Sequence, residues 1–328
     1  MIRTGFCCFI LKSDGSRMEG TEFKSTTQKF LKSRSFAEQA SKIGGIVAHN
    51  LKSLSNSIHY VSMLPEEQRM FRIGSDLFGF YEHPEFKVHY EPLMPFITSE
   101  LKKIGDSARA ANIRLSMHPD QYCVINSETQ EVVDKSLLFL EYHADVARMM
   151  GYGVTKQDFK INIHLSGRSN IIPYDRMSDT VKNTLTFEND ERTGTLERVL
   201  GICEKYDIPC VLDIHHHWCN TGDYLFEGDE LIERVKRTWV GTNMRPVLHV
   251  SHSREEVWPD KVEAPCMTDI LKNITRKETF KHSDMIDNEA FIEYLACTFR
   301  SDFDFQVEAK LKSIASAALV KKLKLYEV

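Results

Sequence analysis

The sequence predicts a (β/α)8 barrel, also called a TIM barrel, formed as a single domain by residues 1–328. The first observation is an alternation: short apolar segments are followed by longer segments with apolar residues at helical spacing, eight times along the chain. Such repetition is typical of parallel strands joined by helices. The second observation is an absence, because no G-x-G-x-x-G turn follows the first strand. A doubly wound dinucleotide-binding sheet, the alternative α/β fold, is therefore disfavoured.

The eight expected strands are short runs in which apolar residues predominate. In order, they are residues 2–10, 69–77, 113–122, 159–167, 185–191, 208–217, 245–253 and 304–310. The expected helices place apolar residues three or four positions apart. They are residues 36–57, 97–112, 131–151, 175–184, 194–207, 227–240, 288–299 and 311–328. The polar stretch 254–288 separates the seventh strand from its helix, and the sequence predicts no structure for it.

Composition is that of an ordinary globular protein, with 42% hydrophobic and 27% charged residues. No apolar run approaches the roughly 20 residues that span a bilayer, and the first residues lack the features of a signal peptide. None of the eight cysteines forms a C-x-x-C pair, so we expect reduced thiols and a location in the cytoplasm, or in the nucleoid or nucleus with the DNA. The net charge of −5 argues weakly against a nucleic-acid partner, but bound cations would reverse the local field.

Potential metal ligands recur near the carboxyl ends of six successive strands. They are His118, His164, Glu188, Asp213 with His216, His249 and Glu308. In a barrel these strand ends meet at one mouth, where active sites of this fold lie. A single strand-end histidine is more often a packing residue, but this many buried imidazoles and carboxylates would be costly without bound cations. Of the three consecutive histidines, 215–217, at least one is expected to face solvent.

This mixture of side chains predicts the type of metal centre. Imidazoles and carboxylates without thiolates suit bound Mn²⁺, Zn²⁺, Fe²⁺ or Co²⁺ rather than a closed structural zinc site. There are more ligands than one tetrahedral ion needs, so we expect two or three ions that share carboxylates. Clustered divalent ions promote phosphodiester hydrolysis, which makes a metallohydrolase the leading interpretation.

The motifs at these positions resemble those of the UV damage endonucleases, a family of DNA repair nucleases. The similar segments run in order along almost the whole chain. They are "MIRTGF", "RIGSDLFGFYEHPEF", "RLSMHPDQYCVINS", "INIHLSGR", "LTFENDER", "VLDIHHHWCN", "RPVLHVSHS", "KHSDMI" and "VEAK". The resemblance implies a monomeric TIM-barrel enzyme that binds up to three divalent metal ions, usually Mn²⁺, with Mg²⁺, Co²⁺ or Zn²⁺ as alternatives. It also implies nicking of double-stranded DNA immediately 5′ to pyrimidine dimers or (6-4) photoproducts, leaving 3′-hydroxyl and 5′-phosphate ends.

The resemblance assigns roles to individual residues. The implied metal ligands are His118, His164, Glu188, Asp213, His216, His249, His282 and Glu308. Glu188, His83 and Lys310 would be catalytic, with His83 at the edge of the site and Lys310 contacting a phosphate. An internal ion pair between Lys310 and Glu308 is the competing interpretation. Gln121 and Tyr122 would be inserted into the duplex at the lesion, and Phe6 and Asn189 would also contact the DNA.

Two positions depart from the family pattern. A lysine that can be carboxylated to bind metal often lies two residues before the seventh-strand histidine, but this chain has Val247 there. An expected tyrosine near the end of the first strand is Phe6, which keeps the ring and lacks the hydroxyl. These departures leave open a damage-binding protein with a weakened metal site. A metal-dependent sugar isomerase also remains an alternative, because such enzymes place His, Glu and Asp at the strand ends of a similar barrel.

Overall fold

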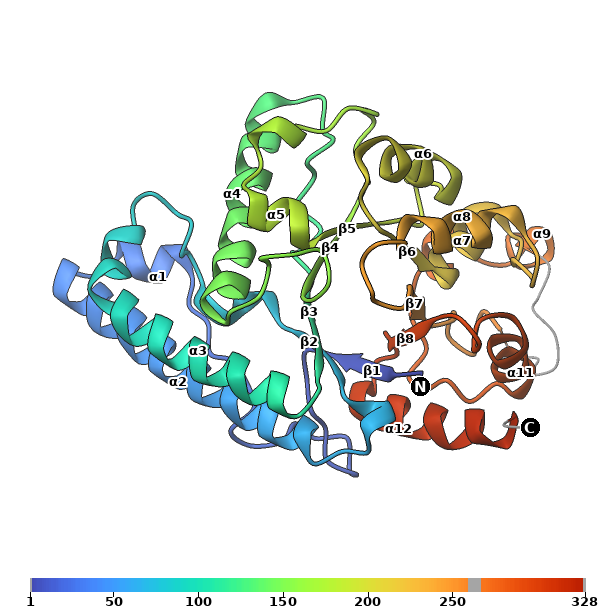
Figure 1. The fold of residues 1–328 in the computed structure, drawn as a ribbon, viewed down its shortest axis with the longest axis horizontal. Coiled ribbons are helices and arrows are strands. Elements are labelled where there is room, and N and C mark those ends of the chain that lie inside the picture. Colours follow the sequence, from blue (N-terminus) through green and yellow to red (C-terminus); the bar gives the residue numbers. More distant parts are fainter. Residues whose placement is uncertain (1, 259–266, 327–328) are drawn as a thin grey trace.

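Eight parallel strands form a closed barrel in the computed structural model, which describes residues 2–258 and 267–326. The strands follow the order of the chain around the barrel, and β8 closes against β1 (Figure 1). They are β1 (Thr4–Cys7), β2 (Met70–Ile73), β3 (Arg114–Met117), β4 (Lys160–His164), β5 (Leu185–Glu188), β6 (Cys210–Asp213), β7 (Val247–Val250) and β8 (Asp304–Val307). The predicted TIM barrel is confirmed.

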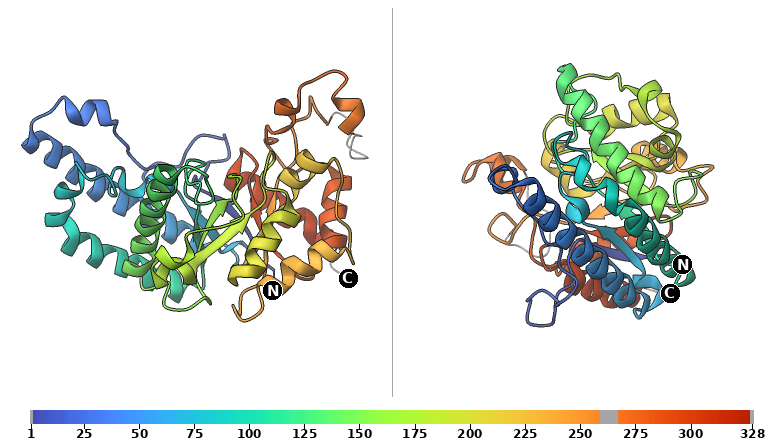
Figure 2. Two further views of the ribbon diagram at one scale, coloured as in Figure 1. Left: turned by 90° about the horizontal axis from the view of Figure 1, so that it is seen from above. Right: turned by 90° about the vertical axis from the view of Figure 1, so that its left-hand side faces the viewer.

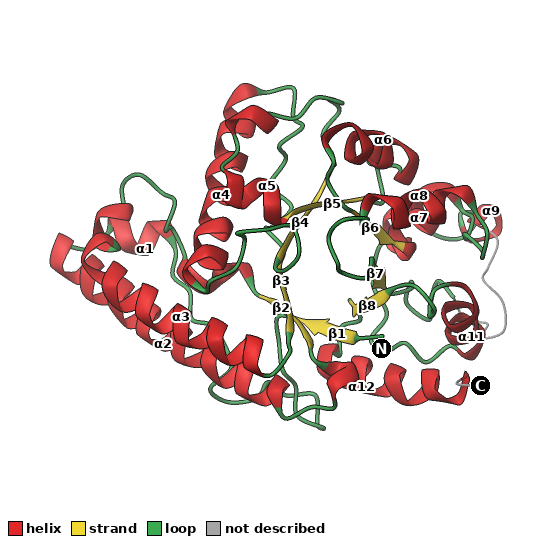
Figure 3. Ribbon diagram, viewed as in Figure 1, coloured by secondary structure: helices red, strands yellow, loops and turns green. Residues whose placement is uncertain are grey.

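Helices surround the strands on the outside of the barrel (Figure 3). The α-helices are α1 (Gln28–Lys32), α2 (Phe36–Ser62), α3 (Met94–Ala110), α4 (Gln130–Met149), α5 (Asp179–Thr184), α6 (Leu196–Tyr206), α7 (Ile214–Thr221), α8 (Glu230–Thr238), α9 (Met267–Ile270), α10 (Arg276–Thr279), α11 (Glu289–Thr298) and α12 (Lys312–Leu323). Short 3₁₀ helices lie at Glu66–Gln68, Ser75–Phe78, Lys87–His89, Glu91–Leu93, Tyr174–Arg176 and Lys324–Tyr326. The apolar residues that alternate outward on the strands, such as Ile161, Ile163 and Leu248, are buried against this helical layer.

The sixth predicted strand, residues 208–217, is wrong beyond Asp213. There the strand ends and α7 begins, so the three histidines lie in the first turns of a helix. The cause is local: the Asp213 side chain accepts a hydrogen bond from the backbone N–H of His216 at 2.7 Å, as the N-cap residue of a helix does. Three short helices, α1, α9 and α10, were also not predicted, and the end of the predicted helix 311–328 lies partly outside the described residues.

The interior of the barrel is unusually polar at the end where the strands begin. Arg114 and Asp304 form a buried ion pair of 2.6 Å between β3 and β8.

The neighbouring strands β1 and β2 approach closely at Gly5, where a Cβ atom would lie 2.4 Å from the carbonyl oxygen of Met70. A side chain at position 5 would therefore force the two strands apart.

The helix α2 is much longer than the strands it packs beside. Its 27 residues correspond to roughly 40 Å, whereas a four-residue strand spans about 13 Å. As the connection from β1 to β2, α2 must return from the carboxyl ends of the strands to their amino ends. Its first turns and the preceding α1 therefore extend beyond the rim, and Figure 2 (left) shows α1 and the segment of α9 and α10 rising on the same side of the molecule.

Candidate metal centre

Seven of the eight predicted ligands come together at the carboxyl ends of the strands. They form three groups in which the candidate ligand atoms all lie within 4.8 Å of one another. The groups are His118–His164–Glu188, Glu188–Asp213–His216 and Asp213–His249–Glu308. Strand pairing sets this arrangement, because His164 is in register with Glu188 and Asp213 with His249. Glu188 and Asp213 each belong to two groups, so these buried clusters could bind more than one metal ion.

Glu188 is the central carboxylate of the site and is fully buried. Its oxygens lie 2.9 Å from His249 Nδ1 and 3.3 Å from His118 Nε2, and it accepts a hydrogen bond from the amide of Asn162. Burial alone would raise the pKa of Glu188, but the surrounding imidazoles, His249 above all, hold it well below its usual range. The side chain is therefore an ionised carboxylate, the form that binds a cation.

Asp213 uses its two carboxylate oxygens differently. Oδ1 caps α7, whereas Oδ2 is buried and accepts no hydrogen bond from the described residues. Burial raises the pKa of Asp213 to about 7. Burial would lower the pKa of His216, but the carboxylates of Asp213 and Glu188 raise it to about 9. An unsatisfied buried oxygen beside a protonated imidazole is costly, and a divalent cation would satisfy the oxygen and replace the proton.

The imidazole of His164 is in a form that can bind a metal ion. Burial lowers the pKa of His164 to about 4, so the ring is neutral at pH 7. Its Nδ1 is buried without a hydrogen-bond partner among the described residues. Neutral imidazoles and ionised carboxylates together are ligands for Mn²⁺, Zn²⁺, Fe²⁺ or Co²⁺. The residues present therefore fit a group of divalent metal ions.

Arg72 is a residue of the site that sequence reasoning missed. It comes from β2 and forms a close ion pair with Glu308, in which each side chain is only 13% exposed. Burial would raise the pKa of Glu308, but Arg72 and then His249 hold it well below the usual value. In the sequence, a single arginine in an apolar strand looks like a side chain on the solvent-facing side of the strand. Its partner Glu308 lies 236 positions away, so the sequence does not show that the two residues pair. The only available signal was its inward strand parity.

Asn189 and Phe6, for which the resemblance implies DNA contacts, are both buried and contact protein groups. Asn189 is buried, its Nδ2 donates to the Asp213 carbonyl at 2.9 Å, and its Oδ1 accepts from the Asp213 N–H at 2.9 Å. Its amide thus holds a metal-ligand candidate in place. Phe6 is 2% exposed, and its ring packs 5.4 Å from that of Phe71, because an aromatic ring without a hydroxyl can be buried fully at the strand end.

All three histidines of the run 215–217 are buried, so the expectation that one of them faces solvent is wrong. The Nε2 atom of His215 lies 2.9 Å from the Thr279 carbonyl oxygen and 3.1 Å from Ser253 Oγ. His282 lies outside the three ligand groups, with its ring centroid 6.0 Å from that of His216. Burial lowers the pKa of His282 to about 4. His282 is thus a neutral imidazole next to the cluster.

His83 and Lys310, the other predicted catalytic residues, make different contacts from those expected. The Nε2 atom of His83 lies 3.1 Å from the Gln28 amide nitrogen in α1, and no contact with the three ligand groups is among its described interactions. The Nζ atom of Lys310 lies 3.8 Å from Asp284 Oδ1. The alternative ion pair between Lys310 and Glu308 is not formed, because Glu308 is paired with Arg72 and lies 3.2 Å from His249.

A cavity of about 560 Å³ opens beside the ligand groups. Its wall includes His118, His164 and Glu308 together with Gln121, from the loop that follows β3. The next residue, Tyr122, has 72% of its surface exposed. Both predicted lesion-sensing side chains therefore lie at the solvent-facing edge of the metal centre.

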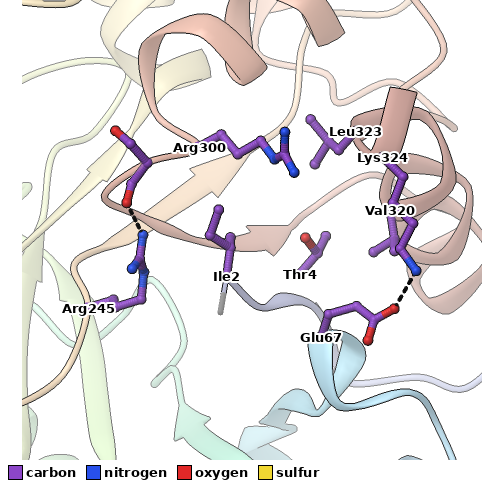
Figure 4. Close-up of a pocket in the computed structure, with 9 residues that line it drawn as sticks. Ile2, Thr4, Glu67, Arg245, Arg300, Val320, Leu323 and Lys324 are labelled. Carbon is purple, nitrogen blue, oxygen red and sulfur yellow. Dashed lines mark hydrogen bonds and ion pairs between the residues drawn. The ribbon is translucent and has the colours of Figure 1, made fainter. Parts of the chain in front are cut away.

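Another pocket, of about 520 Å³, lies at the opposite end of the barrel (Figure 4). It is lined by residues at the start of β1 and the end of α12, and Lys324 pairs there with Glu67 at 2.7 Å. No histidine lines this pocket.

None of the helices in the described part of the chain combines the length and apolarity needed to cross a membrane.

Comparison with known proteins decides the family. The model of the UV-endonuclease UvdE family matches residues 2–328. The chain belongs to this family. It is 28% identical to the UV DNA damage endonuclease of Bacillus mycoides over 302 residues, which cover 87% of this chain and 84% of that protein. The Bacillus cereus enzyme of the same name is 27% identical and covers 92% of this chain and 89% of its own length.

Solved structures agree with the family and the fold. The crystal structure of SacUVDE superposes with a TM-score of 0.74 at 26% identity, covering 99% of both chains. Endonuclease IV from Thermus thermophilus superposes with a TM-score of 0.52 at 15% identity over 83% of this chain and 93% of its own, and this likeness concerns the fold alone. The match of the UvdE model to residues 2–328 makes this barrel, which has clustered candidate ligands at its mouth, a member of an endonuclease family.

Proposed function

We propose that this protein is a metal-dependent endonuclease that nicks double-stranded DNA immediately 5′ to UV photoproducts, leaving 3′-hydroxyl and 5′-phosphate ends. The observation that carries the proposal is the set of three ligand groups that share Glu188 and Asp213 in a chain matched throughout by the UvdE model. His118, His164, Glu188, Asp213, His216, His249 and Glu308 would hold two or three divalent ions, Mn²⁺ foremost. When bound, such ions activate water and stabilise negative charge on a phosphate undergoing displacement.

The protein's own residues prepare this site. Glu188 and Glu308 remain ionised beside the imidazoles and Arg72, while Asn162 and Asn189 orient Glu188 and Asp213 by hydrogen bonds. Fixed ligand orientation matters because outer hydrogen-bonding partners commonly change metal affinity or activity 10- to 100-fold, by about 1.4 to 2.8 kcal/mol. His282, which borders the groups, would act as an additional ligand or as a support for His216.

Gln121 and Tyr122 would recognise the lesion. Both side chains are exposed at the edge of the cavity that contains the ligands. Inserting a side chain between bases costs a few kcal/mol, and a damaged, poorly stacked step reduces that cost. A protruding Gln–Tyr pair next to a phosphodiesterase site would therefore favour damaged duplex. Replacing both residues by alanine should reduce the preference for damaged over intact duplex, whereas unchanged discrimination would assign lesion sensing to another loop.

The deciding experiment is incision of a duplex that contains one defined pyrimidine dimer. The protein is stripped of metal with a chelator, and Mn²⁺ is then added back. We expect no cleavage without metal and a single nick 5′ to the dimer with it, mapped by the lengths and end groups of the products. Binding to damaged duplex without incision at any metal concentration would instead support a damage-binding protein, and turnover of a ketose or aldose without incision would support an isomerase.

A further inference from the structure

We propose that residues 23–37, which include α1 and are called here the α1 arm, bind the phosphate backbone of duplex DNA from the edge of the cavity to about five base pairs from the lesion. The inference rests on the proposed function, since it places a second contact on the same duplex. It concerns a surface that lies outside the ligand groups and outside the Gln121–Tyr122 loop.

The charge of the α1 arm differs from that of the chain as a whole. Its sequence, FKSTTQKFLKSRSFA, contains four basic residues and no acidic one, whereas the whole chain has a net charge of −5. The basic residues are Lys24, Lys29, Lys32 and Arg34. The arm also contains five serines and threonines. Lysine, arginine and hydroxyl side chains are the groups that most often contact DNA phosphates.

These basic side chains are available to a partner. All four residues are exposed. Lys24 and Lys29 have no acidic group within 4.0 Å among the described residues. Lys32 lies 3.2 Å from Glu85 and Arg34 lies 3.8 Å from Glu38, but both pairs are about half exposed. Exposed pairs of this kind contribute little and are readily exchanged for a phosphate.

One cation of the α1 arm and one of the adjoining helix α2 lie over the same aromatic ring of the arm. The Arg34 guanidinium lies 4.8 Å from the centroid of the Phe30 ring, and the Lys42 ammonium lies 5.6 Å from it. Phe30 is fixed in turn by the N-cap of α1, where Thr27 Oγ1 accepts from the Phe30 N–H at 3.2 Å. Ordering the side chains before binding reduces the entropy lost when they contact a ligand.

The α1 arm is continuous with the cavity of the metal centre. Phe23 and Ser25 line that cavity together with His118 and Glu308. Three residue steps lead from Ser25 to Gln28, the first residue of α1, and four more lead to Lys32. Lys32 therefore lies within about 16 Å of Ser25, given about 3.3 Å per extended residue and 1.5 Å per helical residue. Since one strand of B-DNA advances about 3.4 Å per nucleotide, this distance corresponds to about five base pairs. A duplex whose lesion is at the cavity can therefore reach the arm, which projects beyond the barrel rim (Figure 2).

A double substitution tests the proposal: Lys24→Ala with Lys29→Ala. The matched control is Lys52→Ala with Lys321→Ala. It also removes two exposed lysines that have no acidic partner among the described residues, one in the C-terminal half of α2 and one in α12. Affinity for a 30-base-pair duplex, intact or with one dimer, is measured by fluorescence anisotropy from about 50 to 300 mM salt. Each phosphate neutralised contributes about 0.9 to the slope of log K against log salt concentration.

For the arm variant we expect the slope to become shallower by about 1.8 and the affinity at 0.1 M salt to fall at least about tenfold. The loss should be the same for intact and damaged duplex, because phosphate contacts carry no lesion information. The incision rate at saturating substrate should be unchanged while KM rises, which shows that the variant is folded and active. The control should match the wild type.

The proposal is overturned if the slope is unchanged in the arm variant, or if the control variant loses as much affinity. It is also overturned if the arm variant keeps its DNA affinity but loses binding to vesicles containing phosphatidylserine, which would make the surface a membrane contact. If the wild type makes no incision at all, the proposed function fails, whereas the comparison on intact duplex still decides whether the arm binds DNA.

Discussion

Replacing Arg72 by methionine should destabilise the metal-free protein and, at the same time, strengthen metal binding. Arg72 is the buried partner of Glu308, and each side chain is only 13% exposed. Removing one partner of a buried pair leaves an uncompensated charge and costs about 3–5 kcal/mol. With about 2.1 cal/mol/K of unfolding entropy per residue over 328 residues, this corresponds to a fall in Tm of about 4–7 °C.

The effect on metal binding has the opposite sign. Arg72 carries a positive charge next to one of the candidate ligands, so it repels a cation held by Glu308. Like unit charges about 6 Å apart repel by about 3 kcal/mol at an effective dielectric constant of 20. We therefore expect the Mn²⁺ affinity of Arg72→Met to rise at least about tenfold, measured by calorimetric titration of the chelator-treated protein.

Arg114→Met is the matched control. Arg114 forms a buried pair with Asp304, whose side chains are 7% and 5% exposed, but at the end of the barrel away from the ligand groups. This variant should lower the Tm by a similar amount and leave the Mn²⁺ affinity within about twofold of the wild type. A fall of metal affinity in Arg72→Met, or an equal change in both variants, would refute the electrostatic role assigned to Arg72.

Three further outcomes are expected. Glu188→Gln should reduce the incision rate at least about 100-fold, because the amide cannot supply the negative charge that two of the ligand groups share. The affinity for damaged duplex should change little. Equal incision rates of the variant and the wild type would remove Glu188 from the catalytic cluster. The apparent Mn²⁺ affinity should rise by about one to two log units per pH unit from pH 6 to 8.5. The pKa values of His216 and His249 are raised to about 9, and both rings must release a proton to bind metal. An affinity that does not change with pH in the same buffers would contradict this prediction. Asn189→Ala should lower the Tm by about 3–6 °C, because two buried backbone groups of Asp213 lose their hydrogen-bond partners at a cost of about 1–2 kcal/mol each. The same variant should bind Mn²⁺ about tenfold more weakly. An unchanged Tm of the metal-free protein would show that Asn189 does not support Asp213.

The position of the candidate metal centre could be predicted because it depends only on architecture. Once the alternation of strands and helices indicates a barrel, His164, Glu188 and His249 must meet at one rim, since the carboxyl ends of all strands lie there. No knowledge of side-chain contacts was needed. The structure places these residues in groups of candidate ligand atoms within 4.8 Å of one another, and the groups are linked through Glu188 and Asp213, as that reasoning requires.

The details that failed depend on tertiary contacts. The run VLDIHHH continues the apolar pattern of a strand, and only the hydrogen bond from His216 to Asp213 reveals a helix start. The role of Arg72 requires Glu308, which is remote in sequence. The family resemblance suggested that Phe6 contacts DNA, but packing against Phe71 buries the ring. In each case a partner selected by folding, rather than a local propensity, determines the outcome.

The shared use of the Asp213 carboxylate has a consequence for regions far from the metal ligands. One oxygen caps the first turn of α7 and the other belongs to two groups of candidate ligands, so any shift of α7 moves a candidate ligand. The same helix carries Trp218 and Cys219, which pack with Val257, Met267 and Ile270 in a small apolar cluster separate from the main core. Substitutions in that cluster can therefore displace Asp213, a candidate ligand, without contacting it, so the packing of the segment after β7 helps to set the geometry of the candidate metal centre.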